Sequence, residues 1–406
     1  MKMQININPR LRLSPFVMVL LALMGIAFVV AMIRFAVGIG AISNLSNAYP
    51  WGFWVSFDLF TGIAISSGAF VITAMVYILE LEEFRPLIRP TLLTGFLGYV
   101  MEMIALLVDL GHPERIWHYF IYQNFTSFLL VIGLYVMIYS GIMAVEFAPV
   151  VLERLKLQKL AALIKRFMKP LVIIGATISV LHQGSLGALL LIQPAKLYPL
   201  WWTPILPVLF FISALAIALA MIIFESSLSS RYFHRGLETH LLEKLAAIIP
   251  FVAGIYLIVR FVQLAFAGDL QYLFNGGSMS ILFWSEILLS SVIPLILFSI
   301  KRIRQSPRGL LTGAIILLLG MMLDRFDVSW FAVRHPDPIS YIPTFMASNV
   351  HYLPSLPEIS ISLGIFSAGI LAFGLAAKYL PLFEEEEEHP KPAQRTPISS
   401  SKAASD

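Results

Sequence analysis

The chain has 406 residues, of which 58% are hydrophobic and only 13% are charged, whereas soluble domains carry about 25% charged residues. This composition excludes a soluble protein held by a single membrane anchor. Because the sequence contains no cysteine, it also excludes disulfides, thiol catalysis and an iron–sulfur cluster bound by thiolates of this chain.

Ten apolar segments follow one another along the sequence. Each is continuous rather than alternating, and each is about 20 residues long, which is the length an α-helix needs to cross a bilayer. The sequence therefore predicts an all-α, polytopic membrane protein with ten transmembrane helices. The predicted spans are 14–39, 51–79, 90–110, 125–148, 168–192, 203–226, 243–267, 279–300, 309–325 and 356–380.

The positions of Lys and Arg predict the orientation of these spans. An even number of spans places both ends of the chain on one side of the membrane, and Arg34 and Arg260 lie within spans. Of the 28 Lys and Arg residues, the segments opposite the termini hold only Arg115, Lys196, Arg325 and Arg334. Loops rich in Lys and Arg stay in the cytoplasm, so both termini are predicted to be cytoplasmic.

The segments outside the spans differ in character. We expect residues 1–382 to form one membrane domain. Residues 383–406, which contain the acidic run Glu384–Glu388, read as a disordered cytoplasmic tail. On the opposite, outer side, the segment 326–355 is long enough to act as a docking or lid element.

The second span begins with an unusual entry. Residues Tyr49–Phe60 combine the rings of Trp51 and Trp54 with an ionisable residue, Asp58, a turn or two inside the span. Trp and Tyr favour the membrane–water interface. A carboxylate within a span is costly to bury, so it usually faces protein or water and marks a site. The alternative is that Asp58 is a polar residue of helix packing.

Further polar residues fall near the outer ends of other spans. Asp109 closes the third span, and His182, Gln183 and Ser185 lie where the fifth span approaches the outer face. We expect these side chains to share one depth with Asp58. A neutral imidazole beside amide and hydroxyl groups suits the carbonyl oxygen of a quinone, and its titration range suits proton exchange. The alternative is a histidine that only makes hydrogen bonds between helices.

A second group of charged residues interrupts the spans at deeper or more cytoplasmic levels. Each member should pair with another charge or line a hydrated cavity. The group either forms a proton path from the outer site to the cytoplasm or consists of structural ion pairs, and the sequence leaves both open. Its members are Arg34, Glu102, Glu146, Glu225, Arg260 and Glu286.

Haem b is a poor match to the sequence. Its ligation by two histidines needs two imidazoles that face each other inside the bundle. Only His182 of the eight histidines lies clearly within a span.

Together, these stretches resemble the NrfD/PsrC-like family of integral membrane subunits, and within it the ten-span, HybB-like type. The resemblance covers nearly the whole chain, and its strength lies in the combination of motifs. The matching stretches are Gly38–Gly40, Tyr49–Trp54 with Asp58, Glu146–Pro149, His182–Gly187, Leu200–Trp201, Ile223–Ser226, Arg260–Phe261, Phe266–Asp269, Phe283–Glu286 and Tyr352–Ser355 with Glu358.

The resemblance implies two four-helix bundles with two peripheral helices in the bacterial inner membrane. It also implies a quinone- or quinol-binding subunit of a respiratory oxidoreductase complex that binds neither haem nor a metal centre. The implied partners are a ferredoxin-like iron–sulfur subunit on the periplasmic face and, beyond it, a catalytic subunit. That subunit would be a hydrogenase, a molybdopterin enzyme or a multihaem cytochrome c. No nucleic acid is expected.

The expected function is therefore exchange of electrons between a docked iron–sulfur subunit and menaquinone or ubiquinone, with possible coupling to proton translocation. His182 and Asp58 are the expected proton-exchanging residues, with Trp51, Trp54, Asp109, Gln183 and Ser185 completing the quinone site. One departure leaves the soluble partner open: hydrogenase-type members carry a carboxylate at the position of Val131. The alternatives are a secondary transporter that uses the buried Arg and Glu residues and a purely structural membrane anchor.

Overall fold

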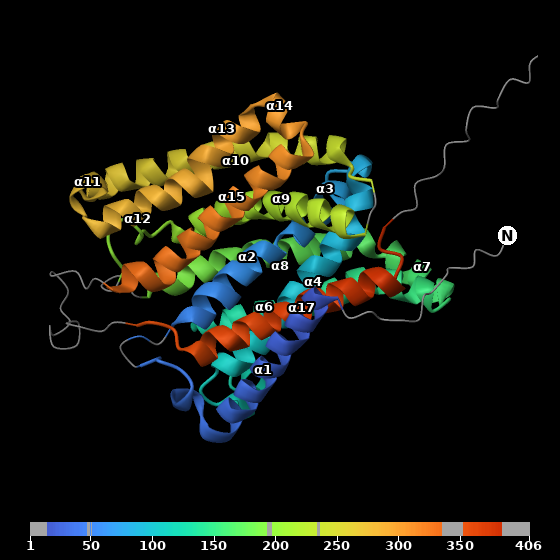
Figure 1. The fold of residues 1–406 in the computed structure, drawn as a ribbon, viewed down its shortest axis with the longest axis horizontal. Helices are drawn as coiled ribbons and strands as arrows, with labels where there is room; N and C mark the ends of the chain where they lie inside the picture. Colours follow the sequence, from blue (N-terminus) through green and yellow to red (C-terminus); the bar gives the residue numbers. More distant parts are fainter. Residues whose placement is uncertain are drawn as a thin grey trace, which may run out of the picture.

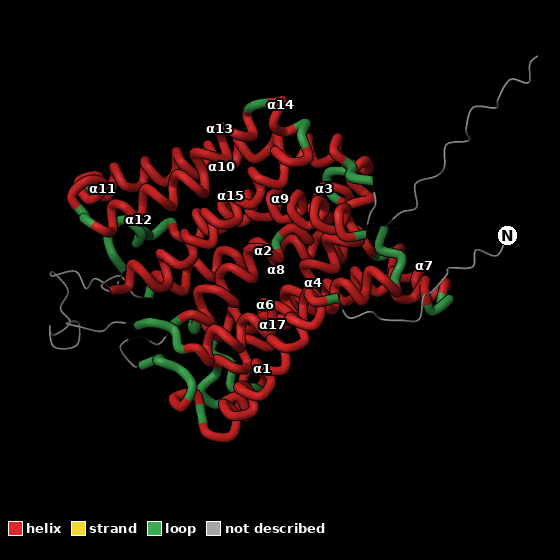
Figure 2. The backbone as a smooth tube through the Cα atoms, viewed as in Figure 1, coloured by secondary structure: helices red, strands yellow, loops and turns green. Residues whose placement is uncertain are grey.

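The structure, a computed structural model, describes residues 14–46, 49, 51–192, 197–233, 236–334 and 352–383. Within these residues the regular elements are all helices, and ten of them are long and apolar enough to cross a membrane (Figure 2). The all-α prediction and its ten spans are confirmed. The predicted tail lies outside the described residues, apart from Phe383.

The first five spans alternate with short surface helices. They are α1 (Pro15–Val37), a composite of η2 (Val55–Thr61), α2 (Gly62–Ser66) and α3 (Gly68–Tyr77), then η3 (Glu82–Leu87) with α4 (Ile88–Asp109), α6 (Phe128–Arg154) and α8 (Met168–Leu191). Between them lie η1 (Ile39–Ala41), η4 (Pro113–Arg115), α5 (His118–Ile121) and α7 (Gln158–Arg166).

The last five spans include two that change helix type along their length. They are α9 (Leu206–Tyr232), α10 (Thr239–Ala267), a composite of α12 (Ser278–Ile287), η6 (Leu288–Val292) and α13 (Ile293–Ser299), then α15 (Pro307–Phe326) with η7 (Asp327–Phe331), and α17 (Leu356–Tyr379). The connecting elements are η5 (Asp269–Gln271), α11 (Tyr272–Asn275), α14 (Lys301–Arg304) and η8 (Ala332–Arg334).

Serine caps define where several spans begin. Four serines each accept a hydrogen bond from the backbone amide three residues further on, which satisfies one of the free amides at a helix start. These serines are Ser14, Ser127, Ser306 and Ser355. Proline follows three of these caps within the first two helical positions, where the ring costs no hydrogen bond.

The spans form the expected two bundles and a peripheral pair. The composite second span, α4, α6 and α8 pack together, and α9, α10, the α12–α13 span and α15 form the second group. Helix α9 also packs on α3 and α8, so it joins the two bundles. Helices α1 and α17 pack on each other, and α17 packs on α4 at the edge of the first bundle (Figure 1).

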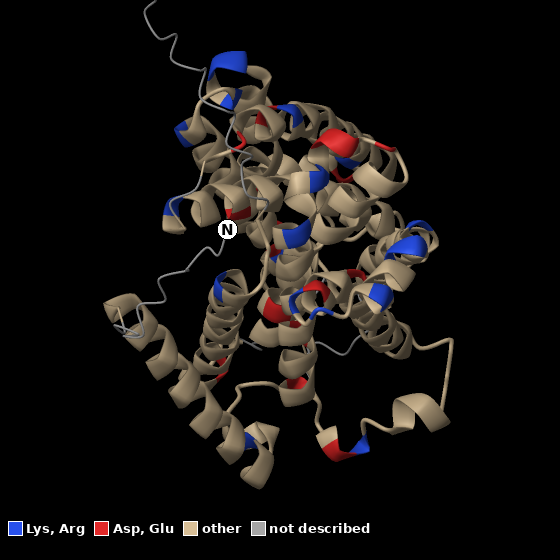
Figure 3. Cartoon of the chain, turned by 90° about the vertical axis from the view of Figure 1, so that its right-hand side faces the viewer, with Lys and Arg blue, Asp and Glu red and all other residues tan. Residues whose placement is uncertain are grey.

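The end of the molecule that carries α7 is rich in basic residues. Figure 3 looks onto this end and shows Lys and Arg segments spread across it. Arg89 there donates to the carbonyl oxygen of Pro381 at 2.9 Å and pairs with Glu153 at 3.4 Å, which ties the segment after α17 to α4 and α6. The C-terminal end of α17 therefore lies at this basic end.

The prediction that residues 326–355 form an outer segment is wrong for its first part. The ninth span continues from α15 into the π-helical η7, and the short helix η8 follows. Arg325, predicted to lie outside the membrane, is inside this span and only 1% exposed. The stretch Asp324–Asp327 resembles a surface loop in composition, but its charges are buried against charges of other helices. Residues 335–351 of the segment lie outside the described residues, and Tyr352–Ser355 lead into α17.

Candidate functional site

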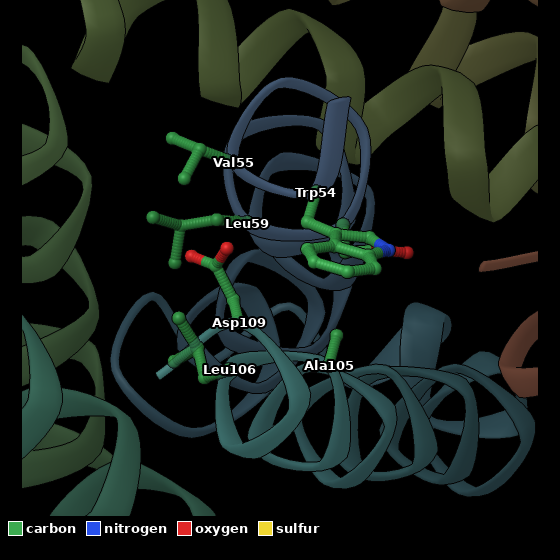
Figure 4. Close-up of a pocket in the computed structure, with 7 residues that line it drawn as sticks. Trp54, Val55, Leu59, Ala105, Leu106 and Asp109 are labelled. Atoms are coloured by element: carbon green, nitrogen blue, oxygen red, sulfur yellow. The ribbon is translucent and has the colours of Figure 1, made fainter. Parts of the chain in front are cut away.

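A crevice opens between the second span and the C-terminal half of α4. Its empty volume is about 170 Å³, and its lining residues are Trp54, Val55, Asp58, Leu59, Ala105, Leu106 and Asp109. Figure 4 shows the Asp109 carboxylate turned toward Val55 and Leu59, with the Trp54 ring beside them. Residues four positions apart share a face of a helix, so the residues that line the crevice come from two successive turns of each helix. The crevice thus combines apolar walls, one indole and two carboxyl groups.

Asp58 lies within a π-helical segment of the second span. In η2 the Thr61 hydroxyl donates to the carbonyl oxygen of Ser56 at 2.9 Å, five residues back. The Ser362 hydroxyl of α17 donates to Asp58 Oδ2 at 2.6 Å. Asp109 and Glu102 of α4 both lie within electrostatic range of Asp58. Single π-helical turns are frequent at functional sites, and here the turn carries the acid toward α4 and α17.

Arg34 closes the C-terminal end of α4 from the side. Its Nε donates to the carbonyl oxygen of Val108 at 2.6 Å, and its Nη2 donates to that of Leu110. These carbonyls belong to the helix C-terminus, where a cation also interacts favourably with the helix dipole. The guanidinium lies within electrostatic range of Asp109. The prediction that Arg34 belongs to a deeper group is therefore wrong, because it lies beside the crevice.

Replacing Arg34 by Ala should destabilise the protein by about 2–3 kcal/mol, since hydrogen bonds to a charged group contribute about 1.5–3 kcal/mol. The loss leaves two buried carbonyl oxygens at the end of α4 without their donor. Thermal unfolding of the purified chain in detergent measures the change. Arg34→Lys should recover part of the stability. Arg115→Ala is a control at an exposed outer arginine and should change it by less than about 0.5 kcal/mol. Equal stability of Arg34→Ala and the parent would contradict this role.

Helix α17 holds two of the residues that line the crevice, Trp54 and Asp58. Ser355 and Glu358 form a capping box at its start, and Trp54 Nε1 donates to the Glu358 carbonyl oxygen at 3.1 Å. The Tyr352 hydroxyl donates to Glu358 Oε1 at 2.6 Å. Burial, followed by the hydrogen bond to Glu358, raises the pKa of Tyr352, so this phenol remains a donor. The Ser-x-x-Glu spacing is a sequence signal for the cap, whereas no local pattern marks Ser362.

His182 lies deeper than the crevice. Its Nδ1 is 3.1 Å from the Tyr99 hydroxyl, and its buried Nε2 has no hydrogen-bond partner in the part of the chain that the structure describes. Tyr99 precedes Asp109 by ten residues of α4, which is about 15 Å along the helix axis. The prediction that His182 shares one depth with Asp58 and Asp109 is therefore wrong. Helix α8 continues for nine residues beyond His182, as the predicted span 168–192 already implied, so the histidine is nearer the middle of the span.

The remaining predicted site residues fall into two groups. Gln183 Nε2 donates to the Ile63 carbonyl oxygen at 3.2 Å, and the Ser185 hydroxyl donates to the His182 carbonyl oxygen at 2.8 Å. Both therefore bind backbone near His182. Trp51 packs against the main hydrophobic core and is not among the residues that line the crevice, whereas Trp54 is.

A column of buried polar groups continues from the crevice through the first bundle. Glu102 is 2% exposed and lies within electrostatic range of Asp58 and Tyr99, and neither of its carboxylate oxygens has a hydrogen-bond partner among the described residues. The Tyr99 ring contacts that of Tyr139 at 4.8 Å between centroids. The buried hydroxyl of Ser179 lies beside both phenols.

Glu146 extends this column toward the basic end. It lies on α6, within electrostatic range of Tyr139 and close to Gly175 of α8. Two of the predicted proton-path residues, Glu102 and Glu146, therefore belong to one continuous series in the first bundle. Tyr99, Tyr139 and Ser179, which the sequence analysis missed, fill the space between them.

The other predicted path residues belong to the second bundle. Glu286 accepts a hydrogen bond from Trp201 Nε1 at 2.6 Å and lies within electrostatic range of Arg260. Glu225 is separate, buried in the last two turns of α9. These residues do not continue the column of the first bundle, so the predicted group divides in two.

Three residues that the sequence analysis missed complete the charged cluster of the second bundle. Asp324 pairs with Arg325 and accepts a hydrogen bond from Tyr256 at 3.1 Å. Arg325 also donates to the Ser213 hydroxyl at 2.6 Å. Asp327, which is fully buried, lies within electrostatic range of Arg260. The sequence could have pointed to these residues, because Asp324, Arg325 and Asp327 directly follow an apolar run.

Histidines other than His182 lie at the ends of spans or outside the described residues. His112 and His118 follow α4 at the outer end, and His240 is in the first turn of α10. The histidines outside the described residues are His234, His335, His351 and His389. Within the described part of the chain, no group of three or more His, Asp or Glu side chains has an arrangement that could hold a metal ion.

Known proteins match the chain over most of its length. The family model described as "Polysulphide reductase, NrfD" matches residues 41–330. A protein of Nitratidesulfovibrio vulgaris is 35% identical over 371 residues, which cover 89% of this chain and 92% of that protein. The probable Ni/Fe-hydrogenase 2 b-type cytochrome subunit of Escherichia coli is 29% identical over 376 residues, covering 91% and 93%. The integral membrane subunit of menaquinone reductase from N. vulgaris is 28% identical over 381 residues, covering 87% and 88%.

Proposed function

Because the chain belongs to the NrfD family of integral membrane proteins, we propose that it is the quinone-binding membrane subunit of a respiratory oxidoreductase complex. The observation that carries the proposal is the crevice at the outer ends of the second span and α4. There, Asp58 and Asp109 border an apolar space next to Trp54. The names of the hydrogenase and menaquinone reductase relatives support the same class of function.

The chemistry of the crevice suits a quinone head group. In this proposal the flat ring system of the quinone binds between the second span and α4, while the isoprenoid tail remains in the lipid. The Trp54 indole offers an aromatic wall, and the carboxyl groups of Asp58 and Asp109 can bind or exchange protons at the two quinone oxygens. These contacts suit the ring of menaquinone and the ring of ubiquinone equally, so the proposal covers both quinones.

Reduction of the quinone consumes two electrons and two protons, and oxidation of the quinol releases them. The chain has no cysteine to bind an iron–sulfur cluster, so the electrons would pass through a ferredoxin-like iron–sulfur subunit docked on the outer face. Beyond it, the catalytic partner would be a hydrogenase, a molybdopterin enzyme or a multihaem cytochrome c. The quinone carries the redox chemistry, and this chain supplies binding, orientation and protons.

Protons for Asp58 would come through the first bundle. Glu102, the Tyr99–His182 pair and Tyr139 lie in sequence between the crevice and Glu146. In this arrangement His182 acts as a relay rather than as a ligand of the quinone. With both termini in the cytoplasm of a bacterial inner membrane, such a path would draw protons from the cytoplasmic side. Quinone reduction at the outer end would then move charge across the membrane.

Haem is not part of the proposal, although the name of the E. coli relative contains the term b-type cytochrome. Ligation by two histidines needs a second imidazole opposite His182. Within the described residues, the groups next to the His182 ring are the phenols of Tyr99 and Tyr135.

Binding of a fluorescent quinol-analogue inhibitor to the purified complex tests the proposal. We expect saturable quenching of its fluorescence, and Trp54→Ala should weaken binding about tenfold, because an aromatic contact contributes about 0.5–1.5 kcal/mol beyond burial. Trp51→Ala is the matched control, since Trp51 does not line the crevice. Absence of quenching in an assembled complex would mean that the chain binds no quinone, and it would favour a purely structural membrane anchor. Quinone-independent solute uptake by proteoliposomes would instead favour a transporter. An optical spectrum of the same preparation reports any haem.

A further inference from the structure

The linker between α6 and α8 carries a helix unlike the spans. We propose that α7 (Gln158–Arg166) is an interfacial helix that inserts an apolar face into the bilayer boundary and binds the anionic head groups of phospholipids. The inference is independent of the quinone site. It rests on the exposure of its apolar side chains, on its unpaired cations and on its position.

The apolar face of α7 is turned away from the protein. Leu157, Leu160, Leu163 and Phe167 follow at spacings of three and four residues, and they are 50%, 46%, 53% and 57% exposed. This spacing places them on one side of the helix. Ala161, only 2% exposed, anchors the adjoining side of α7 against the protein. An apolar face of this kind, next to a polar and basic face, is typical of helices that lie in the plane of a membrane interface.

The linker is strongly basic. Between Glu153 and Pro170 there is no Asp or Glu. Lys165 pairs with Glu153, and Lys169 pairs with Glu80 at 2.7 Å. The remaining cations make no ion pair with any described residue, and they are Arg154, Lys156, Lys159 and Arg166. Cations at a membrane surface attract anionic lipids, so these four have the charge complementary to a phospholipid phosphate.

The position of α7 places its apolar face beside the lipid and its basic face beside the head groups. It connects the end of α6 to the start of α8, where both spans leave the hydrocarbon, and Figure 1 shows it at the edge of the bundle. This is the end of the molecule where Lys and Arg gather (Figure 3). The leucine face therefore adjoins the lipid-facing surface of the spans, and the basic face adjoins the head groups.

Native mass spectrometry of the complex measures lipid binding directly. The probe is phosphatidylglycerol titrated into the detergent-solubilised complex, with phosphatidylcholine as the neutral reference. Each removed cation should weaken phosphatidylglycerol binding about fivefold, so Lys156→Gln, Lys159→Gln and Arg166→Gln together should abolish selective retention. The matched control removes three exposed cations of the same end through Lys301→Gln, Arg302→Gln and Arg308→Gln, and it should retain the lipid.

Depth of the helix is measured separately. Since the chain has no native cysteine, single spin labels at Leu163→Cys and, on the opposite side of the helix, Gln158→Cys report oxygen and aqueous-reagent access without background. We expect the label at position 163 to be in lipid and the label at position 158 to be in water. Equal aqueous access at both positions would overturn the proposal. So would lipid loss equal to that of the control triple variant, or displacement of the bound lipid by inorganic phosphate at equal concentration.

Discussion

Asp58→Asn should lower quinone-linked turnover of the assembled complex by about 10²–10⁴-fold, the range over which a positioned general acid or base acts. Asn keeps the size of the side chain and can still accept the hydrogen bond from the Ser362 hydroxyl, so assembly should be normal. What is lost is the group that exchanges a proton with the bound quinone. The measurement is steady-state reduction of a soluble quinone analogue by the purified complex, together with its subunit composition.

Two further variants sharpen this result. Ser362→Ala removes the hydrogen bond to Asp58 but leaves the acid, and it should reduce turnover much less than Asp58→Asn. His182→Ala breaks the contact with Tyr99. It should slow turnover while leaving the affinity for the quinone analogue unchanged, because His182 lies in the proton relay rather than in the crevice. Full turnover of both Asp58→Asn and His182→Ala in complexes of normal composition would remove these residues from the mechanism.

Arg325→Met should destabilise the protein by about 3–5 kcal/mol, the cost of breaking a buried ion pair by removing one partner. Arg325 is 1% exposed and its guanidinium lies 3.9 Å from the centroid of the Phe210 ring. It is the ion-pair partner of Asp324 and a hydrogen-bond donor to Ser213. Without it, Asp324 loses its ion-pair partner, whereas Arg260 remains within electrostatic range of Glu286 and Asp327. Thermal or denaturant unfolding of the purified chain gives the change in free energy.

A double substitution separates the charge from the packing. Asp324→Asn combined with Arg325→Met removes both partners, and it should recover part of the stability lost in the single variant, as expected for two residues in one network. Arg308→Met, at an exposed position of α15, is the control and should change stability by less than about 0.5 kcal/mol. An unchanged unfolding free energy for Arg325→Met would mean that the cluster does not hold the second bundle together.

Individual residues show which parts of the site the sequence predicted correctly and which it misplaced. Asp58, Asp109 and Trp54 were predicted together and line one crevice. His182 was placed with them because position along a span was the only measure of depth, yet its partner Tyr99 lies about 15 Å along α4 from Asp109. Arg34 was assigned to a deeper group, but the side chain reaches along the end of α4. The reach of the Arg34 side chain and the pairing of His182 with Tyr99, neither of which a hydropathy pattern contains, decided the two outcomes.

The sequence by itself determined the ten helical spans and the family, because span length, continuous apolar runs and short motifs are local properties. It also identified most of the charged residues in the membrane, since each interrupts an apolar run. Only the tertiary structure decided how these charges are grouped. Asp58 meets Ser362 across 304 residues of sequence, and Glu286 meets Trp201 across 85. Such contacts arise from the packing of spans that are distant in the chain, and no local pattern specifies them.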